Sequence, residues 1–259
     1  MRQTLNHIVD IDEKRFVKTV LEYSKRSEEQ YRPLFTHFYN KDWISSMLER
    51  YIDQYTRQRC YFYGGFDASE RQILGISPYE IQQEDFPIMA LRITVKTGIG
   101  KALTHRDYLG ALLGLGIERE TIGDIILKPF GAYIIVEENM VPYISSCLTG
   151  ISKYQSIESQ IISFSDLQID PPQVRIFETT VASLRVDAVA ATGFGLSRGN
   201  ITKLIEAKRV KCNGITSTTK QLVKEGDTIT VRGYGKMRLK QVGGLTKKDR
   251  FHITIEKYV

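Results

Sequence analysis

The positive charge of this chain is concentrated in one segment of its C-terminal third. Residues 183 to 240 contain 12 lysines and arginines against 4 aspartates and glutamates, a net charge of +8. Residues 1 to 182 contain 20 against 24, a net charge of −4, although the whole chain carries +6. Local positive charge attracts phosphate groups, and phosphates can reach only cations that are exposed. We therefore expect the fold of this segment to present its cations at a surface.

The apolar spacing at the start of this segment predicts a short helix. Leu184, Ala188 and Ala191 follow one another at intervals of four and three residues, which places them on one helical face. Serine is a residue type that caps helix N-termini, so we expect Ser183 to begin this helix and Arg185 to point outwards.

A second helix is expected after a glycine-rich break. Ser197 is its expected N-cap, and Ile201, Leu204 and Ile205 form its apolar stripe. Arg198 then lies in the first turn, where the helix dipole disfavours a cation unless an anion is near. We expect a phosphate to supply that anion.

The remainder of the segment predicts a small sheet. Val210 to Cys212 is a short strand that runs into Asn213-Gly214, a pair that favours tight hairpin turns because both residues tolerate positive φ. Residues 225 to 227 are a second turn signal, and Thr228 to Arg232 alternates as a strand. Two helices and such a sheet in about 55 residues are close to the smallest core that folds alone.

These residues resemble a known module. The pattern L-R-x-D, L-S-R, L-I-x-x-x-x-V-x-x-N-G and G-D-x-I-x-V is similar to the S-four-type (alpha-L) RNA-binding domain, which a small-subunit ribosomal protein shares with several pseudouridine synthases and tyrosyl-tRNA synthetases. The match is formed by Leu184, Arg185, Asp187, Leu196, Ser197, Arg198, Leu204, Ile205, Val210, Asn213, Gly214, Gly226, Asp227, Ile229 and Val231. Ala207-Lys208 stands where many members have a glycine. The resemblance implies an RNA-binding domain over residues 180 to 259, and the alternative for a basic run alone is a solvated face.

Composition and length limit the remaining classes of protein. With 259 residues, 42% of them hydrophobic, the chain is long enough for two or three small domains. No run approaches the roughly 18 apolar residues of a membrane span, and the N-terminus lacks the apolar stretch of a signal peptide. Cys60, Cys147 and Cys212 have neither metal-motif spacing nor the even number of a disulfide framework. We therefore expect a cytoplasmic protein without a metal site, a cofactor or a membrane partner.

Residues 1 to 85 are expected to be mainly helical. Apolar residues recur at three- and four-residue intervals from Phe16 to Leu21 and from Trp43 to Tyr55, and Pro33 separates the two patterns. Cys60 to Phe66 is a strand-like aromatic run, and we expect Ile73 to Ile76 to pair with it as a hairpin.

Residues 86 to 165 predict the order strand, helix, strand, strand, helix, strand. The expected elements are Pro87 to Val95, a helix capped by Thr104, Asp124 to Lys128, Ala132 to Val136, Glu137 to Leu148 and Ser156 to Ile162. This is the split βαβ order of ferredoxin-like domains, a fold that RNA-recognition modules also use. The predicted fold class is therefore α+β, and the fold alone does not assign a function.

The loop after the first of these strands contains cations and glycines. Lys96 and Lys101 flank Thr97 to Gly100, and His105 and Arg106 follow. Glycines allow a backbone to approach a phosphate closely and the cations add charge. A nucleic-acid contact and a solvated loop are equally compatible with this sequence.

The stretch His105 to Glu120, HRDYLGALLGLGIERE, together with Ile122 to Ile125, resembles the signature of the YlmH family. Those bacterial proteins join an N-terminal helical region and a central RNA-binding domain to a C-terminal S-four-type domain, so the resemblance covers essentially the whole chain. It implies a cytoplasmic factor that binds rRNA of the large ribosomal subunit when peptidyl-tRNA obstructs it. The implied process is ribosome-associated quality control by alanine tailing, with a tailing factor as a further partner. A role linked to cell division is the alternative, and we expect a monomer.

Enzymatic alternatives require catalytic motifs. His105-Arg106-Asp107 is similar to a kinase catalytic loop, but Leu112 stands where a metal-binding asparagine belongs. A pseudouridine synthase is the stronger rival, because such enzymes often contain the same RNA-binding domain and use a catalytic aspartate on a flipped nucleotide. The nearest candidate, Asp187, already belongs to the RNA-binding motif. We therefore expect a protein that is not an enzyme.

The expected contacts to rRNA or tRNA are mainly ionic. Contacts to the RNA backbone position a protein, so we expect specificity to come from RNA shape. Ser197 and Asn213 are expected to donate hydrogen bonds and to set turns. The candidate RNA-binding residues are Arg185, Ser197, Arg198, Lys203, Lys208, Arg209, Lys211, Asn213, Lys236, Lys101, His105 and Arg106.

Overall fold

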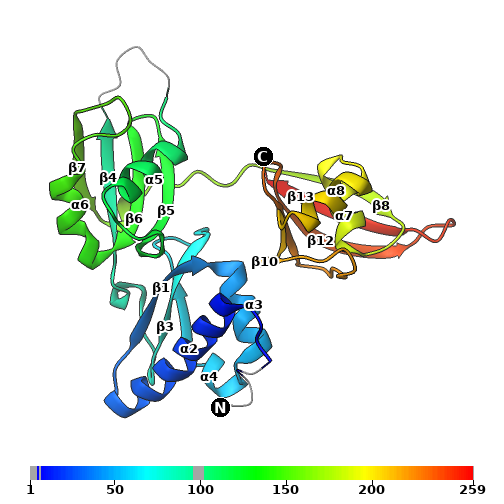
Figure 1. The fold of residues 1–259 in the computed structure, drawn as a ribbon, viewed down its shortest axis with the longest axis horizontal. Helices are drawn as coiled ribbons and strands as arrows, with labels where there is room; N and C mark the ends of the chain where they lie inside the picture. Colours follow the sequence, from blue (N-terminus) through cyan, green and yellow to red (C-terminus); the bar gives the residue numbers. More distant parts are fainter. Residues whose placement is uncertain (1–4, 6, 96–101, 259) are drawn as a thin grey trace. The chain divides into compact units, whose positions relative to one another are not determined.

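The computed structural model describes residue 5, residues 7–95 and residues 102–258. The chain forms two compact units, residues 1–169 and 170–259, and each unit contains helices and sheet (Figure 1). The predicted α+β class is confirmed. The predicted borders at residues 85 and 165 both lie within the first unit, and the division into three domains stays a prediction.

The N-terminal part of the first unit is a three-stranded antiparallel sheet against which helices pack. Its elements are α2 (Ile11–Gln30), β1 (Leu34–Asn40), α3 (Lys41–Tyr51), α4 (Gln54–Arg57), β2 (Cys60–Tyr63), β3 (Arg71–Ile76) and the 3-10 turn η1 (Gln83–Asp85). The strand order is β1-β3-β2. The predicted hairpin is confirmed by the antiparallel pairing of β2 with β3.

Strand β1 lies where the sequence pattern predicts no strand. Helix α2 ends at Tyr31, which adopts a left-handed conformation with φ of 48°. Thr36 and Phe38 of the following strand are buried and His37 between them is exposed, which is the alternation of a half-buried strand. Asn40 then caps α3 by accepting a hydrogen bond from the backbone N–H of Trp43. Pro33 therefore separates a helix from a strand and not two helices.

The central part of the first unit is a four-stranded antiparallel sheet with two helices on one face. Its elements are β4 (Ile88–Val95), α5 (His105–Gly114), η2 (Arg119–Thr121), β5 (Ile122–Lys128), β6 (Gly131–Glu137), η3 (Glu138–Met140), α6 (Val141–Cys147), β7 (Ile157–Ile162) and η4 (Phe164–Asp166). The strand order β5-β6-β4-β7 agrees with the predicted split βαβ arrangement. The second helix is shorter than predicted, because residues 138–140 form a 3-10 turn before it.

The two faces of the central sheet have different partners. Leu91 and Ile93 of β4 share a core with residues of α5 and α6. On the other face, Ala90 and Ile135 pack together with Phe38 of the N-terminal sheet. The N-terminal sheet thus covers part of the face that the helices leave free.

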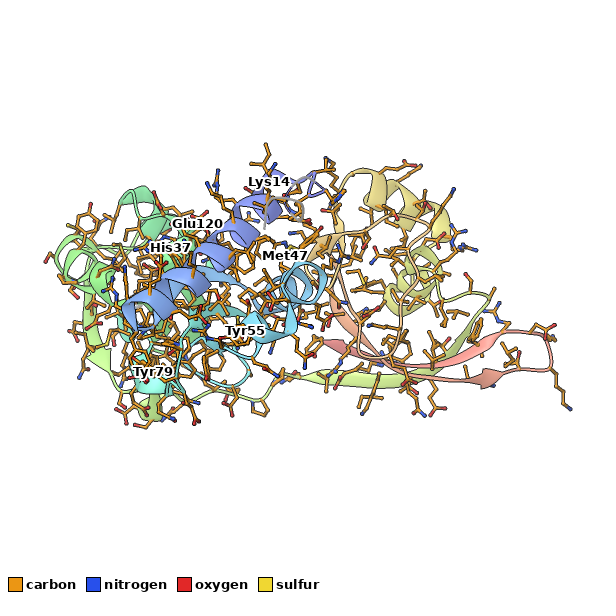
Figure 2. All side chains as sticks on the ribbon, turned by 90° about the horizontal axis from the view of Figure 1, so that it is seen from below. Lys14, His37, Met47, Tyr55, Tyr79 and Glu120 are labelled. Atoms are coloured by element: carbon orange, nitrogen blue, oxygen red, sulfur yellow. The ribbon has the colours of Figure 1, made fainter. Side chains whose placement is uncertain are left out.

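The second unit is a six-stranded antiparallel sheet with two helices on one face, as Figure 2 shows from below. Its elements are β8 (Val174–Val181), α7 (Val186–Phe194), α8 (Arg198–Glu206), β9 (Val210–Cys212), β10 (Ile215–Thr216), β11 (Thr228–Val231), β12 (Gly235–Leu245) and β13 (Phe251–Tyr258). The strand order is β10-β9-β11-β12-β13-β8. Residues of β8, β12 and β13 join the helices in one core, which enlarges the small core predicted from the basic segment.

The predicted local signals of this unit are confirmed at two positions. Ser197 caps α8 by accepting a hydrogen bond from the backbone N–H of Asn200 at 3.2 Å. Asn213 and Gly214 have φ angles of 49° and 76°, as expected for a tight hairpin turn between β9 and β10.

The predicted start of α7 is wrong. The helix begins at Val186 with Arg185 as its N-cap residue, so Ser183 is not the cap. The reason is a tertiary contact: Arg185 forms an isolated antiparallel bridge with Leu222, and the backbone N–H of Val223 bonds to the carbonyl oxygen of Leu184. This pairing holds residues 184 and 185 in an extended conformation.

Helix α8 ends in a Schellman-type cap whose left-handed residue is a lysine. The backbone N–H of Lys208 bonds to the carbonyl oxygen of Ile205, and that of Arg209 bonds to Leu204. Lys208 has a φ of 55°. Glycine is the most favourable residue in this left-handed position after a helix, so the lysine side chain makes the conformation of Lys208 less favourable than it would be for glycine.

Candidate nucleic-acid interface

Two arginines of the basic segment share one buried carboxylate. The Asp187 side chain accepts a 3.1 Å hydrogen bond from Arg185 Nε and a 2.8 Å hydrogen bond from Arg198 Nη2. Asp187 is 4% exposed, whereas the arginine side chains are 38% and 53% exposed. Burial by itself would raise the pKa of Asp187, but the hydrogen bonds and charges of Arg198 and Arg185 hold that pKa below its usual value.

This cluster changes the expectation for Arg198. The anion beside the first turn of α8 is Asp187, which belongs to the same chain, so no external phosphate is needed to hold Arg198 there. One carboxylate balances two guanidinium groups, and each guanidinium has five N–H donors. The cluster therefore holds a net positive charge in a fixed position with donors left over for an external anion.

The remaining helix-side cations lie along α8 and at its end. Lys203, Lys208 and Arg209 are all exposed. Arg209 Nη2 donates a 2.9 Å hydrogen bond to the carbonyl oxygen of Arg232, which fixes its guanidinium beside the turn after β11. These cations meet the geometric requirement for phosphate contacts, namely exposure on an ordered element.

Two predicted polar contacts are used inside the protein. Asn213 donates from Nδ2 to Asp227 at 2.8 Å, and its Oδ1 accepts from the backbone N–H of Thr228 at 2.8 Å. Ser197 accepts a hydrogen bond as the cap of α8. Both residues set local structure, as predicted, and the hydrogen bonds that they form in this structure are to the protein itself.

Lys211 and Lys236 lie on a different face of the second unit. Val210 and Cys212 face the core beneath α7 and α8, so Lys211 between them points away from the helices. Met237 also faces this core, which puts Lys236 on the same outer face as Lys211. The structure therefore does not bring the predicted cations together on one surface.

The predicted contacts of the central part are only partly described. Lys101 lies outside the described residues. His105 and Arg106 are exposed in the first turn of α5, which begins with a capping box between Thr104 and Asp107. Although the residue as a whole is exposed, partial desolvation of its ring, followed by the charge of Arg119, lowers the pKa of His105. His105 is therefore neutral at pH 7 and contributes a hydrogen-bonding group more than a charge.

Arg92 is a candidate for an RNA contact that was not predicted from the sequence. Its guanidinium carbon lies 4.2 Å from the centre of the Phe130 ring, and Phe130 contacts Tyr133 edge to face at 5.2 Å. On the sheet face opposite α5 and α6, Arg92 and Phe130 are half-buried and Tyr133 is buried. The alternation of β4 could have indicated this residue. Arg92 lies between Leu91 and Ile93, which face the helices, so its side chain points to the opposite face of the sheet.

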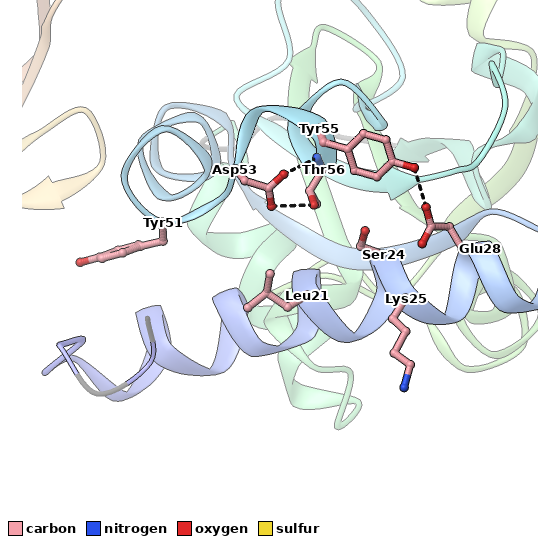
Figure 3. Close-up of a pocket in the computed structure, with 8 residues that line it drawn as sticks. All are labelled: Leu21, Ser24, Lys25, Glu28, Tyr51, Asp53, Tyr55 and Thr56. Atoms are coloured by element: carbon pink, nitrogen blue, oxygen red, sulfur yellow. Dashed lines mark hydrogen bonds between the residues drawn. The ribbon is translucent and has the colours of Figure 1, made fainter. Parts of the chain in front are cut away.

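A pocket of about 420 Å³ lies beside α2 and α4 (Figure 3). Four of its polar residues pair with one another: Tyr55 donates to Glu28 at 2.8 Å, and Asp53 accepts from the backbone and side chain of Thr56. The hydrogen bond from Tyr55, opposed by desolvation and aided by Arg59, lowers the pKa of Glu28. The arrangement is that of a hydrogen-bonded helix junction.

The Cys60 thiol is not poised to act as a nucleophile. Burial raises the pKa of the Cys60 thiol to about 12, which removes its nucleophilic thiolate at neutral pH. Among the described residues no group of three or more His, Cys, Asp or Glu side chains is arranged to hold a metal ion. No described helix is both long and apolar enough to cross a membrane.

Comparison with known proteins gives matches to both units. A family model described as "Putative RNA-binding domain in YlmH" matches residues 81–166, and the S4 domain model matches residues 184–229. A solved structure, "Cell division protein ylmH from Streptococcus pneumoniae", aligns with a TM-score of 0.52 at 21% identity, over 63% of this chain and 98% of that one. That likeness concerns the fold.

A curated relative extends the match to almost the whole chain. "Ribosome-associated protein quality control protein P2" of Bacillus subtilis (strain 168) is 31% identical over a match of 252 residues, and the match covers 95% of each chain. The match therefore includes the helical N-terminal part, which neither domain model reaches. With this relative and the two domain matches, the chain belongs to the YlmH family, and it combines this RNA-binding domain with an S4 domain.

Proposed function

We propose that this protein is a non-catalytic factor that binds rRNA and tRNA on the large ribosomal subunit during ribosome-associated quality control of stalled peptidyl-tRNA. The observation that supports it most is the cluster of Arg185, Arg198 and Asp187, which lies inside the segment matched by the S4 domain. The name of the B. subtilis relative supports the ribosomal setting.

The cluster suits recognition of an RNA backbone. Arginine forms bidentate hydrogen bonds with phosphate, and a guanidinium that is already held in place loses less conformational entropy when it binds. Lys203, Lys208 and Arg209 add exposed charges on the same helix and at its end. Such contacts position a protein on a folded RNA without reading its bases.

The rival function, an RNA-modifying enzyme such as a pseudouridine synthase, is disfavoured by the state of Asp187. A catalytic carboxylate has to reach the flipped nucleotide. Asp187 is 4% exposed and accepts hydrogen bonds from both arginines, so its oxygens serve the fold of the cluster. We accordingly assign no catalytic residue.

The proposed partners are those that a quality-control factor on the large subunit would contact. They are rRNA of the large subunit, peptidyl-tRNA and a factor that adds alanine tails, and the proposed location is the cytoplasm, where these partners meet. The exposed cations would make the association sensitive to salt, because each phosphate contact releases counterions.

Sedimentation with ribosomal particles tests the proposal. We expect the tagged protein to move with large subunits that carry peptidyl-tRNA at low salt and to dissociate at high salt. Arg198→Gln removes the charge but keeps a hydrogen-bond donor near Asp187, so it should dissociate at lower salt than the wild type while its melting temperature stays close. Absence of the wild-type protein from all ribosomal fractions would refute the proposal.

A further inference from the structure

The sheet of the second unit has an outer face that no helix of this unit covers. Helices α7 and α8 share their core with Val210, Met237 and Ile255, which fixes the inner face. Figure 2 shows both helices on one side of strands β8, β12 and β13, with only side chains on the other side. We call this outer surface of β8, β9 and β11–β13 the open sheet face.

Cations gather on the β9–β12 side of the open sheet face. Thr230 of β11 pairs with Lys211 on one neighbouring strand and with Lys236 on the other, so the three side chains form a row across the sheet. Neighbouring strands are about 4.8 Å apart, which puts the two lysines roughly 10 Å from each other. Arg238 and Lys240 continue the positive charge along β12, and both are exposed.

The β13–β8 side of the open sheet face is aromatic and apolar. The Lys236 Nζ atom lies 5.7 Å from the centre of the Tyr258 ring. Tyr258 pairs with Val174 of the edge strand β8. On this strand the apolar residues Val174 and Ile176 are 38% and 50% exposed. Glu256, which pairs with Arg238, and Glu178 are the acidic residues on this side, so the charge changes sign across the face.

We infer that the open sheet face binds a single-stranded segment of RNA, with its phosphates on the lysines of β9 and β12 and a base or sugar against Tyr258 and Ile176. Proteins hold single strands by combining a row of cations with aromatic and apolar side chains at the surface, and here these are the half-buried Tyr258 and the exposed Val174 and Ile176. The inference rests on the proposed function and adds to it a second surface, because the S4 match ends at residue 229, before β12 and β13 begin.

The charge pattern favours RNA over a protein partner. A protein that covered Val174 and Ile176 alone would leave the lysine row uncovered. Lys211, Lys236, Arg238 and Lys240 stand on the β9–β12 side, and Glu256 of β13 lies across from Arg238. A polyanion with stackable bases complements both sides of the open sheet face at once.

Photo-crosslinking of the full-length protein tests the location. A benzoylphenylalanine is placed at Thr230, the exposed centre of the lysine row, or at Asn200, an exposed residue of α8. Each protein is bound to bacterial large subunits that carry peptidyl-tRNA and is irradiated. We expect RNA crosslinks from both positions. Crosslinks from Asn200 alone, or crosslinks from Thr230 to protein only, overturn the inference while leaving the proposed function intact.

A charge-matched pair of variants tests the energetics. The first combines Lys211→Gln, Lys236→Gln and Lys240→Gln, and its control, Lys14→Gln with Lys18→Gln and Lys25→Gln, removes the same charge from exposed positions of α2. With a mixed-sequence single-stranded RNA as the probe, the loss of three phosphate contacts should make the slope of log affinity against log salt shallower by about 2. The control should keep the wild-type slope.

The outcomes of this binding experiment are distinct. Equal slopes for the two triple variants overturn the inference, provided that Arg198→Gln still weakens binding to the probe. If the wild-type protein binds neither the probe nor large subunits, the proposed function fails and the inference fails with it. Thermal melting of both variants checks that these surface changes leave the fold in place.

Discussion

Arg71 Nε donates a 2.9 Å hydrogen bond to the carbonyl oxygen of Ile122, and so joins the N-terminal sheet to the central sheet. The same guanidinium donates to the carbonyl oxygens of Phe38 and Arg119 at 2.8 and 3.2 Å. Burial, and then the charge of Arg119, lowers the pKa of Arg71 to about 10, so the group stays protonated at neutral pH. Asp124 completes the junction by accepting from the backbone N–H of Arg71.

Arg71→Ala should destabilise the first unit by about 3 kcal/mol, because three carbonyl oxygens lose a charged donor at a half-buried site. Thermal or urea unfolding measures this. Arg57→Ala, at an exposed position of α4, is the control and should stay within about 0.5 kcal/mol of the wild type. Equal stability of the Arg71→Ala and Arg57→Ala variants would mean that the hydrogen bonds of Arg71 contribute nothing to the free energy of unfolding.

The shared carboxylate of Asp187 makes Arg198→Ala different from Arg198→Gln. The alanine variant leaves Asp187 with Arg185 as the one remaining arginine of the cluster, and we expect a loss of about 1 to 3 kcal/mol in unfolding free energy. Glutamine keeps a donor near the carboxylate and should lose less. Urea unfolding of both variants at neutral pH separates the two cases, and equal losses would contradict the proposed role of the hydrogen bond.

The same cluster predicts a pH dependence. Because the folded-state pKa of Asp187 lies below its ordinary value of 3.8, the cluster stabilises the fold fully above that value and loses this contribution as the pH falls through the lower folded-state pKa. Asp187→Asn should therefore differ most from the wild type at neutral pH and least in acid. A difference in unfolding free energy that is the same at every pH would contradict this assignment.

The left-handed conformation of Lys208 permits a test that separates charge from strain. Lys208→Gly and Lys208→Ala both remove the charge, but only glycine adopts a φ of 55° without a penalty. We expect the glycine variant to be more stable than the alanine variant by about 1 kcal/mol. Both should bind RNA more weakly than the wild type. Wild-type affinity in the glycine variant would remove Lys208 from the proposed interface.

Two glycines of the family signature should respond to alanine in opposite ways. A Cβ atom at Gly123 would lie 2.8 Å from the Phe38 ring and 3.1 Å from Ile135, so Gly123→Ala should cost about 1 to 3 kcal/mol through overpacking. A Cβ atom at Gly110 would meet nothing within 4 Å, and Gly110→Ala in helix α5 should stabilise by about 0.5 to 1 kcal/mol. Calorimetry of the two variants checks both signs.

Elements that depend on a few neighbouring residues could be predicted from the sequence. The cap at Ser197 and the turn at Asn213 follow from side-chain chemistry over at most four residues, and both are confirmed. The central order of strands and helices follows from periodicity in the same way. The short segment Leu34–Asn40 could not be recognised, because its strand is stabilised by pairing with β3, more than thirty residues later.

A strongly basic S4-type segment and the types of its helices and strands could be recognised without a structure, since charge and periodicity are properties of the chain alone. The tertiary structure decided which cations share a surface. Asp187 pairs with Arg198 because α7 and α8 pack together. Lys211 points away from the helices because its neighbours Val210 and Cys212 lie in the core. Packing against the core decides which side chains of each strand and helix face inwards, and this packing depends on residues far away in the sequence.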